Sequence, residues 1–216
     1  MVVKESYLHL LKMVLGAVVL AFVVRSFCYD GYYIPSNSMT PTLVKGDFLL
    51  ASKSSYGYGP FSFPGSRWII IDKMWRDPPV RGDVIVFRHP RVPNKDCVKR
   101  VMAIAGDSVG VKKGIVYVNG YPCPLQKQRA SSHGTVFQET LPSGRQHLIL
   151  KQGMFGKEEY DNTPIVRVPA GSCFVIGDNR EASQDSRDQA RMGFVPYENL
   201  IGRADAFFSI GSRDDS

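Results

Sequence analysis

Short apolar runs separated by turn residues make up most of the chain beyond residue 41. Gly-Asp pairs at 46–47 and 82–83 precede two such runs, and Asn119-Gly120 follows another. Asn-Gly after an apolar run is the strongest short-range signal for a β-hairpin. The pattern predicts strands at residues 48–51, 84–87, 98–105, 115–118, 165–168, 173–176 and 204–210, with one short helical turn at 197–201. We therefore predict a mainly antiparallel β protein.

The N-terminal segment differs from the rest because it is one long, nearly uninterrupted apolar stretch. The run from Met13 to Val24 carries no charge, but its length alone would suit a signal peptide. Lys12 can extend its amine toward a membrane surface, which lengthens the usable span back to Tyr7, about 18 residues and near the minimum for crossing a bilayer. Neither a small-x-small cleavage site nor a lipoprotein box follows. We predict an uncleaved transmembrane helix within residues 1–27.

The composition is that of a folded protein, with 44% hydrophobic residues and a net charge of +7 over 216 residues. No basic run exceeds two residues and no nucleic-acid motif is present, so we expect no nucleic-acid partner. Positive charge spread along the chain fits contact with an acidic membrane surface. The four cysteines lack the spacing of metal ligands, so we expect no metal and no other cofactor. Two interpretations of them stay open, isolated buried thiols and one disulfide, Cys97–Cys123.

Residues 52–75 are rich in tyrosine, phenylalanine and tryptophan and are broken by glycine and proline, so they do not resemble one core strand. Because tryptophan and tyrosine favour the membrane–water interface, this stretch could lie on lipid. A small aromatic cluster beneath a long loop is an equally good interpretation.

A serine-containing segment, residues 34–43, carries the first candidate chemistry. Ser36 and Ser38 stand between Pro35 and Pro41, which restrict the backbone on both sides. A rigid, extended segment suits a nucleophile because a catalytic hydroxyl must be held within a fraction of an ångström. Taken alone, the segment could equally be a polar loop that leaves a membrane helix.

Lys99 is the candidate partner of Ser38. Strict alternation along the strand at 98–105 places Lys99 on the same face as Cys97, Val101 and Ala103, and places Val98, Arg100, Met102 and Ile104 on the other face. An ordinary lysine, with a pKa of about 10.4, is almost entirely charged at neutral pH and cannot act as a base. Burial lowers that pKa and can yield a neutral amine able to accept a serine proton. A surface lysine at a strand edge is the alternative.

Four segments together resemble the conserved boxes of bacterial type I signal peptidases, in the order found in that family. They are residues 34–43, 81–87, 98–107 and 177–187, and the resemblance extends over about residues 30 to 210. The resemblance implies a Ser/Lys dyad with Ser38 as nucleophile and Lys99 as general base. It further implies that the Ser36 hydroxyl and the Ser38 backbone N–H bind the oxyanion, that Ser183 orients the Lys99 amine, and that Asp178, Asp185 and Arg187 support the site.

The same resemblance implies the substrate and the organisation of the chain. Relatives bind the end of a signal peptide as an added β-strand and select small residues in two shallow pockets, whose positions here are Tyr32, Ile34, Met39 and Val98. We expect one anchor over residues 1–27 and an extracytoplasmic catalytic β domain over 28–216. Residues 108–172 or so would form a smaller inserted β subdomain. The expected location is the bacterial inner membrane, with the catalytic domain on the periplasmic side and membrane lipid as a partner.

Some residues depart from the family pattern. Asn37 stands where glycine is usual, Ala105 replaces a proline, and Glu181-Ala182 replaces Asp-Asn. Asparagine tolerates left-handed backbone better than most residues, so we expect the turn at Asn37 to persist. None of these changes touches the proposed nucleophile or base.

Three alternative functions stay open from the sequence. A specialised pilin- or conjugation-pathway peptidase would use the same dyad on other clients. A Ser-His-Asp triad could pair Ser38 with His89. A membrane-anchored β domain could bind exported proteins without cutting them.

Overall fold

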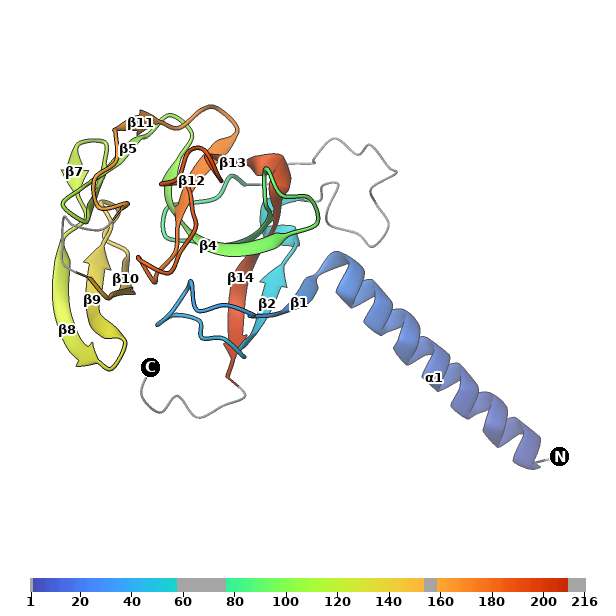
Figure 1. Cartoon of the computed structure of the whole chain (residues 1–216). Coiled ribbons are helices and arrows are strands. Elements are labelled where there is room, and N and C mark those ends of the chain that lie inside the picture. Colours follow the sequence, from blue (N-terminus) through green and yellow to red (C-terminus); the bar gives the residue numbers. More distant parts are fainter. Residues whose placement is uncertain (1, 58–76, 154–158, 210–216) are drawn as a thin grey trace.

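The computed structural model describes residues 2–57, 77–153 and 159–209 of the chain. A long N-terminal helix leads into a body built almost entirely of β-strands (Figure 1). The helix is α1 (Val2–Phe27), and the strands are β1 (Tyr29–Tyr33), β2 (Phe48–Ser52), β3 (Val84–Arg88), β4 (Asp96–Ile104), β5 (Ser108–Lys112), β6 (Ile115–Val118), β7 (Tyr121–Pro122), β8 (Leu125–Ser131), β9 (Gly134–Thr140), β10 (Gln146–Lys151), β11 (Val166–Arg167), β12 (Ser172–Ile176), β13 (Val195–Pro196) and β14 (Leu200–Phe208). Short 3₁₀ turns occur at η1 (Ser54–Tyr56) and η3 (Tyr197–Asn199). All the pairings between these strands are antiparallel, which confirms the predicted fold class.

The largest sheet has seven strands in the order β1-β2-β14-β3-β4-β12-β13. The last strand of the chain, β14, lies between β2 and β3, so the C-terminal part of the body is built into the middle of this sheet. The sheet places β4, which carries Lys99, between β3 and β12. β4 is therefore flanked by strands on both sides, which fixes the backbone around Lys99.

A bulge in β4 changes the faces that strict alternation predicts. β4 pairs with β12 through Ala103–Phe174 and Val101–Val175, which leaves Met102 as an extra residue. Ala103 consequently packs in one core cluster with Met102, while Ile104 packs against the cluster that contains Val101. The prediction that Ala103 shares the Lys99 face was wrong, and so was the opposite placement of Ile104.

The two smaller sheets are built from the middle of the chain, between Ser108 and Arg167. One has the order β11-β5-β6-β7 and the other the order β10-β9-β8. Asn119 and Gly120, between β6 and β7, have φ angles of 53° and 82°. Two consecutive positive φ values are what a type I′ hairpin requires, so the predicted hairpin is confirmed.

Each strand predicted from the sequence coincides with an observed strand, with different limits. The run at 165–168 is reduced to β11, and the run at 204–210 is the end of a strand that already begins at Leu200. The predicted helical turn is η3, after which β14 begins directly. The sequence missed β1, β5, β13 and the whole three-stranded sheet.

The helix α1 occupies the segment for which the sequence predicts a membrane anchor, and it extends away from the β body (Figure 1). Over the three described ranges, no helix meets the length and apolarity needed to cross a membrane. The transmembrane character of residues 1–27 therefore stays a prediction.

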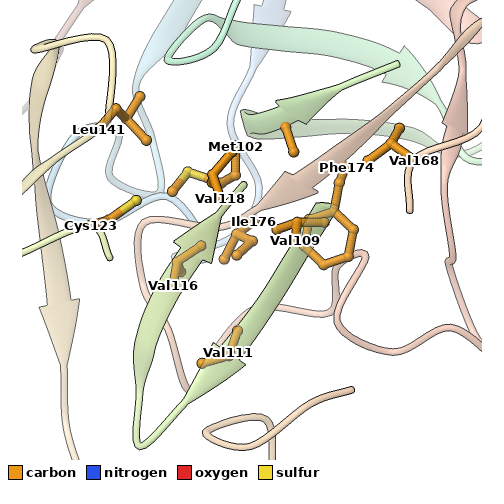
Figure 2. Close-up of a cluster of buried hydrophobic side chains, with 11 residues drawn as sticks. Met102, Val109, Val111, Val116, Val118, Cys123, Leu141, Val168, Phe174 and Ile176 are labelled. Atoms are coloured by element: carbon orange, nitrogen blue, oxygen red, sulfur yellow. The ribbon is translucent and has the colours of Figure 1, made fainter. Parts of the chain in front are cut away.

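Three clusters of buried apolar side chains form the core. Figure 2 shows the cluster in which valines of β5 and β6 meet Met102, Phe174 and Ile176 of the large sheet. This contact packs the four-stranded sheet onto β4 and β12. A second cluster lies beneath the segment that carries Ser38 and contains Ile34, Met39 and residues of β2 and β3.

All four cysteines lie within the described ranges and none forms a disulfide there, so the suggested Cys97–Cys123 disulfide is wrong. Cys123 is buried in the cluster of Figure 2, whereas Cys97 packs against the cluster that contains Val101. The two thiols therefore belong to different parts of the core. Most of the aromatic stretch, residues 58–75, lies outside the described ranges. Tyr56 at its start is buried and donates a hydrogen bond to Asp83 Oδ2 at 2.7 Å.

Candidate active site

Residues 34–47 form a closed loop that carries Ser36 and Ser38. Its two ends meet because the Ile34 N–H donates to the Asp47 carbonyl and the Gly46 N–H donates to the Ile34 carbonyl, both at 2.9 Å. Within the loop, the Leu43 N–H donates to the Met39 carbonyl at 2.9 Å. Buried Ile34, Met39 and Leu43 anchor the loop in the core while Ser36 stays exposed. The backbone around Ser38 is thus held both by hydrogen bonds and by packing.

Asn37 is accommodated differently from what the sequence suggested. The non-glycine residues with positive φ in the described ranges are Asn94, Lys113 and Asn119, so Asn37 does not use left-handed backbone. Its side-chain Oδ1 instead accepts the Lys45 N–H at 3.2 Å, and its carbonyl accepts Asn179 Nδ2 at 3.1 Å. The side chain of Asn37 therefore stabilises the serine loop itself, and its backbone carbonyl links the loop to the 177–187 segment.

Lys99 and Ser38 are in direct contact. The Lys99 Nζ lies 2.6 Å from the Ser38 Oγ, although the two residues are 61 positions apart. Lys99 is 5% exposed, and this burial lowers the pKa of its amine, an effect that Asp185, Cys97 and Asp178 partly oppose. No carboxylate forms an ion pair with Lys99 within the described ranges. A lysine in this environment is disposed to be a neutral base.

The other two serines occupy different positions around this contact. The Ser36 Oγ is 3.3 Å from the Ser38 Oγ and is exposed, so it borders the side from which a substrate would approach. Ser183 is 4% exposed, and its Oγ has no hydrogen-bond partner among the described residues. The expected hydrogen bond from Ser183 to the Lys99 amine is therefore not formed in this conformation. Ser183 instead packs against Gly177, where an added Cβ would lie 2.2 Å from the Ser183 Oγ.

Asp185 and Arg187 brace the backbone of the 177–187 segment. The Arg187 Nε donates to Asp185 Oδ1 at 2.8 Å, and the Gly177 N–H donates to Asp185 Oδ2 at 3.0 Å. The Arg187 Nη2 also donates to the Arg180 carbonyl at 2.6 Å. Burial raises the pKa of the Asp185 carboxyl, but Arg187 and the hydrogen bonds lower it further, so its net pKa lies below the ordinary value. Asp185 is thus an ionised anchor close to Lys99.

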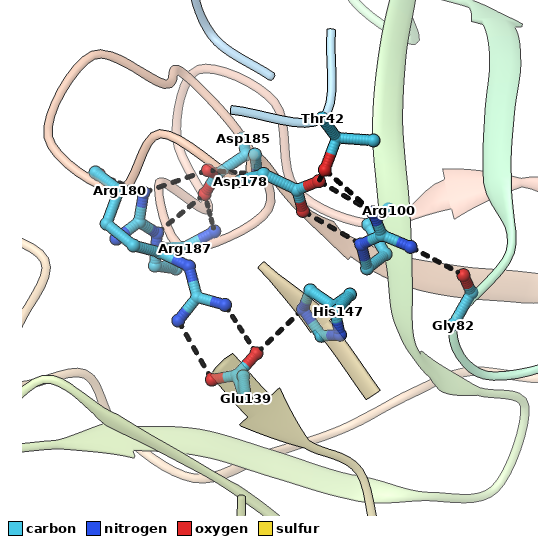
Figure 3. A network of polar contacts seen from close by, with 10 residues as sticks. Thr42, Gly82, Arg100, Glu139, His147, Asp178, Arg180, Asp185 and Arg187 are labelled. Atoms are coloured by element: carbon cyan, nitrogen blue, oxygen red, sulfur yellow. Dashed lines mark hydrogen bonds and ion pairs between the residues drawn. The ribbon is translucent and has the colours of Figure 1, made fainter. Parts of the chain in front are cut away.

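Asp178 forms a second anchor, and its partner was missed in the sequence. The Arg100 guanidinium holds the Asp178 carboxylate through two hydrogen bonds of 2.8 and 2.6 Å, and Thr42 donates a third (Figure 3). The Arg100 Nη1 also donates to the Gly82 carbonyl at 2.9 Å. Arg100 was predicted only to face away from Lys99, which it does. Its position within the same conserved segment as Lys99 was the available signal that it supports the site.

Two further buried ion pairs near the site were also missed. Glu139 of β9 is fully buried, accepts hydrogen bonds from Arg180, and lies 3.0 Å from His147 Nε2 (Figure 3). Glu181 is one of the departures from the family pattern, and its Oε1 accepts a 2.6 Å hydrogen bond from buried Lys151. Both pairs join the 177–187 segment to the three-stranded sheet.

The loop that carries Ser38 is joined to the 177–187 segment through a backbone hydrogen bond. The Asn179 N–H donates to the Ser38 carbonyl at 3.1 Å. On its other side, the same segment pairs with β10, because the Leu150 N–H donates to the Asp178 carbonyl at 2.8 Å and the Arg180 N–H donates to the Leu150 carbonyl at 3.0 Å. The segment is therefore a bridge between the nucleophile loop and the three-stranded sheet.

The four residues expected to line substrate pockets lie in one cluster. Ile34 and Met39 are 3% and 1% exposed, whereas Tyr32 and Val98 are partly buried at its margin. His89 is placed differently from what a catalytic triad needs. Its Nδ1 accepts the backbone N–H groups of Arg91 and Val92, both at 3.1 Å, and the hydrogen-bond partner of Ser38 is Lys99.

Comparison with known proteins places the chain in a family. A model of the signal peptidase family, peptidase S26, matches residues 7–209. The signal peptidase I of Rickettsia typhi is 33% identical over 201 residues, which cover 86% of this chain and 74% of that protein. The signal peptidase I of Rickettsia prowazekii is 32% identical over the same shares. A crystal structure of a signal peptidase I from Enterococcus faecalis aligns with a TM-score of 0.37 at 23% identity, over 60% of this chain and 98% of that one. The chain therefore belongs to the signal peptidase family, peptidase S26.

Proposed function

We propose that this chain is a serine endopeptidase that removes N-terminal signal peptides from exported precursor proteins, with Ser38 as nucleophile and Lys99 as general base. Membership of the signal peptidase family supports the reaction and the substrate class. The observation that carries the assignment of residues is the 2.6 Å contact between the Lys99 Nζ and the Ser38 Oγ at a lysine that is almost fully buried.

The first chemical step is the attack of Ser38 on the scissile carbonyl. Neutral Lys99 accepts the Ser38 proton as the Oγ bonds to the carbonyl carbon, and the carbonyl oxygen becomes an oxyanion. The Lys99 ammonium then donates that proton to the departing amine of the mature protein, which leaves an acyl-enzyme on Ser38. Lys99, neutral again, accepts a proton from a water molecule that attacks the acyl carbon. The Lys99 ammonium then returns this proton to the Ser38 Oγ as the bond between Oγ and the acyl carbon breaks and the signal peptide leaves.

Stabilisation of the oxyanion is assigned to the Ser36 hydroxyl and the Ser38 backbone N–H. The Ser36 Oγ is only 3.3 Å from the Ser38 Oγ, so it borders the position at which charge develops. Ser183, Asp178, Asp185 and Arg187 are assigned as supporting residues. The buried contact between Ser183 and Gly177 supports a role in holding the 177–187 segment against the Ser38 carbonyl.

Substrate binding is assigned to the cluster of Tyr32, Ile34, Met39 and Val98. The shared cluster supports this, because these four side chains pack together in one apolar group. Apolar bulk there would exclude substrate residues larger than Ala, Ser or Gly. We further propose that residues 1–27 anchor the enzyme in the bacterial inner membrane and that the catalytic domain, residues 28–216, lies on the periplasmic side. Residues 108–172 or so would be its inserted subdomain.

The test is cleavage of a signal-bearing precursor by the full chain in detergent. Wild type should release the mature protein at the signal-peptide junction, identified by mass spectrometry of its new N-terminus. Ser38→Ala and Lys99→Arg should both be inactive, because the first lacks the nucleophile and the second has a side chain that does not deprotonate in this pH range. Wild-type thermal stability of Ser38→Ala shows that the fold is intact. Appreciable cleavage by Lys99→Arg would eliminate the dyad.

A further inference from the structure

A polar pocket of about 380 Å³ lies behind the serine loop and is used by no step of the proposed reaction. It is formed where the start of β3, the middle of β4, the β9–β10 hairpin and the end of β14 meet. Its polar wall consists of Arg100, Arg145, His147 and Arg203, and Phe207 forms part of its apolar wall. Asp83 is the only carboxylate among its described lining residues, so the lining has an excess of positive charge.

Arg145 is held by hydrogen bonds from one of its nitrogens, and its other N–H groups have no acceptor among the described residues. Its Nη1 donates to Asp83 Oδ1 at 2.9 Å and to the Arg81 carbonyl at 3.3 Å. Its side chain also lies against Gly82, where an added Cβ would come within 3.0 Å of the Arg145 Cδ. Within the described ranges, its Nε and Nη2 have no hydrogen-bond partner. The guanidinium is therefore pre-organised, and part of it is available to a ligand.

Arg203 contributes a second set of available donors from β14. Its Nε donates to Asp205 Oδ1 at 2.8 Å, which leaves both Nη groups without a hydrogen bond to the described residues. The carboxylate of Asp83 cannot neutralise both arginines, because it already accepts hydrogen bonds from Tyr56 and from the Val80 N–H as well as from Arg145. Each guanidinium therefore has one carboxylate partner, Asp83 for Arg145 and Asp205 for Arg203, and still has N–H groups without a hydrogen bond to the described residues.

His147 is an independent sign that a ligand belongs here. Its side chain is 5% exposed and lies between the Glu139–Arg180 pair and Arg100 (Figure 3). The Nε2 lies 3.0 Å from Glu139, but the buried Nδ1 has no hydrogen-bond partner among the described residues. A buried polar atom without a partner costs free energy, and a ligand in the adjacent pocket would supply the missing hydrogen bond.

We propose that this pocket binds a phosphate group, held by Arg145 and Arg203 with His147 Nδ1 as a further contact. Donors converge on it from β10, from the hairpin and from β14, and a tetrahedral phosphate offers acceptor oxygens in several directions, whereas a carboxylate offers two in one plane. Phe207, which is 39% exposed at the pocket, is available to contact an organic substituent of the phosphate. Both inorganic phosphate and the headgroup of an anionic phospholipid carry this chemistry.

The test measures equilibrium binding of phosphate probes to the full chain in an uncharged detergent. The probes are inorganic phosphate and glycerophosphoglycerol, the deacylated headgroup of phosphatidylglycerol, each followed by ³¹P NMR line broadening at constant ionic strength. The pocket variants are Arg203→Gln and Arg145→Gln. Arg203 is partly exposed in its ion pair, so its replacement should leave the fold intact even if Arg145→Gln is destabilised. Arg191→Gln is the matched control, because Arg191 is an exposed arginine paired with Asp188 away from the pocket.

We expect saturable binding of at least one probe to wild type, weakened about tenfold by Arg203→Gln and by Arg145→Gln and unchanged by Arg191→Gln. Tighter binding of glycerophosphoglycerol identifies a lipid headgroup as the source, and tighter binding of inorganic phosphate identifies free phosphate. Absence of saturable binding to wild type, or equal binding by the pocket variants, would overturn the proposal. The readout does not involve peptide cleavage, so it is separate from the test of the proposed function.

Discussion

Lys99 differs from an ordinary lysine in two respects, both of which follow from its place in β4. It is buried to 5% exposure, and its amine meets a serine hydroxyl at 2.6 Å instead of a carboxylate. Burial lowers the pKa of the amine, whereas an ion pair with a carboxylate would raise it. Asp185 and Asp178 lie close enough to oppose the effect, but Arg187 and Arg100 hold them. The neighbouring ion pairs therefore limit how far these two carboxylates raise the pKa of Lys99.

Ser36→Ala tests the assignment of the oxyanion donor. The Ser36 hydroxyl is exposed and its hydrogen-bond contact is with Ser38, so its removal should barely change the melting temperature. Loss of one oxyanion donor should lower kcat by about 10²–10³-fold. Ser36→Thr keeps a hydroxyl and should recover part of the activity. Both kcat and thermal stability should be measured on the same preparation. A lower melting temperature with normal kcat would mean that Ser36 is only a turn residue.

The contact between Ser38 and Lys99 could be predicted from the sequence, but the arrangement around it could not. Ser38 and Lys99 stand in recognisable segments, and their contact follows from the family resemblance. The direction of the Ser183 hydroxyl could not be predicted, because a motif does not specify the side-chain torsion of a buried serine. The roles of Arg100 and Glu139 were missed because their ion-pair partners are distant in the sequence. Asp178 is 78 positions from Arg100, and Arg180 is 41 positions from Glu139.

At the scale of elements, the 177–187 segment matters most, because it touches both the nucleophile loop and the three-stranded sheet. Gly177 is the point of closest approach. A Cβ at this position would lie 2.2 Å from the Ser183 Oγ and 2.5 Å from the Ser38 carbonyl oxygen. Only glycine fits between a backbone carbonyl of one element and a buried side chain of another.

Gly177→Ala should consequently displace the Ser38 loop. We expect a free energy of unfolding lower by about 1–3 kcal/mol, as for other overpacked sites, together with a loss of kcat. Gly31→Ala is the control for stability, because Gly31 has no atom within 4 Å of an added Cβ and no positive φ. Chemical denaturation of both variants provides the measurement. Unchanged stability and kcat in Gly177→Ala would show that the close contact is not needed.

Two of the strands that the sequence missed, β8 and β9, share a physical reason. β8 is exposed along most of its length, and β9 buries only Val136 and Glu139. Without a regular apolar face, such strands give no period-two signal. The bulge at Met102 in β4 could not be predicted either. The pairing with β12 determines the extra residue, and the local sequence does not indicate it. β3, β4 and β12 of the large sheet were predictable because each carries a run of buried apolar residues.

At the scale of the whole molecule, buried ion pairs join the three-stranded sheet to the rest of the body. Glu139 pairs with Arg180, and Lys151 pairs with both Glu181 and Asp161. Removal of one partner from such a pair leaves an uncompensated buried charge, which is strongly destabilising. Glu181 stands where the family pattern has Asp, and its carboxylate is paired with the Lys151 amine. The charge of Glu181 is therefore compensated in this chain.

These pairs predict instability in acid. Burial raises the pKa of Glu139, but Arg180 and His147 lower it further, to about 2 from an ordinary 4.5. The pKa values of Asp178 and Asp185 are also lowered. A carboxyl whose folded-state pKa is depressed contributes stability that is fully present above its unfolded-state pKa and is lost as the pH falls toward the folded-state value.

The melting temperature should therefore decline as the pH is lowered from about 4.5 to about 2. Differential scanning calorimetry over a pH series provides the measurement. Glu139→Gln should be less stable than wild type at neutral pH, but its melting temperature should depend less on pH in this window. A wild-type melting temperature that stays constant down to about pH 2 would contradict this account.

The pH dependence of kcat/KM for cleavage of a signal-bearing precursor tests the central claim most directly, because it reports the protonation state of the base in the free enzyme. Burial lowers the pKa of Lys99 below its ordinary value of 10.5, so the neutral fraction of the amine increases as the pH rises through that lowered pKa. We expect kcat/KM to rise with pH through an apparent pKa well below that ordinary value and then to level off, while the chain remains folded throughout. A profile that is flat from about pH 6 to pH 10 would contradict a lysine base.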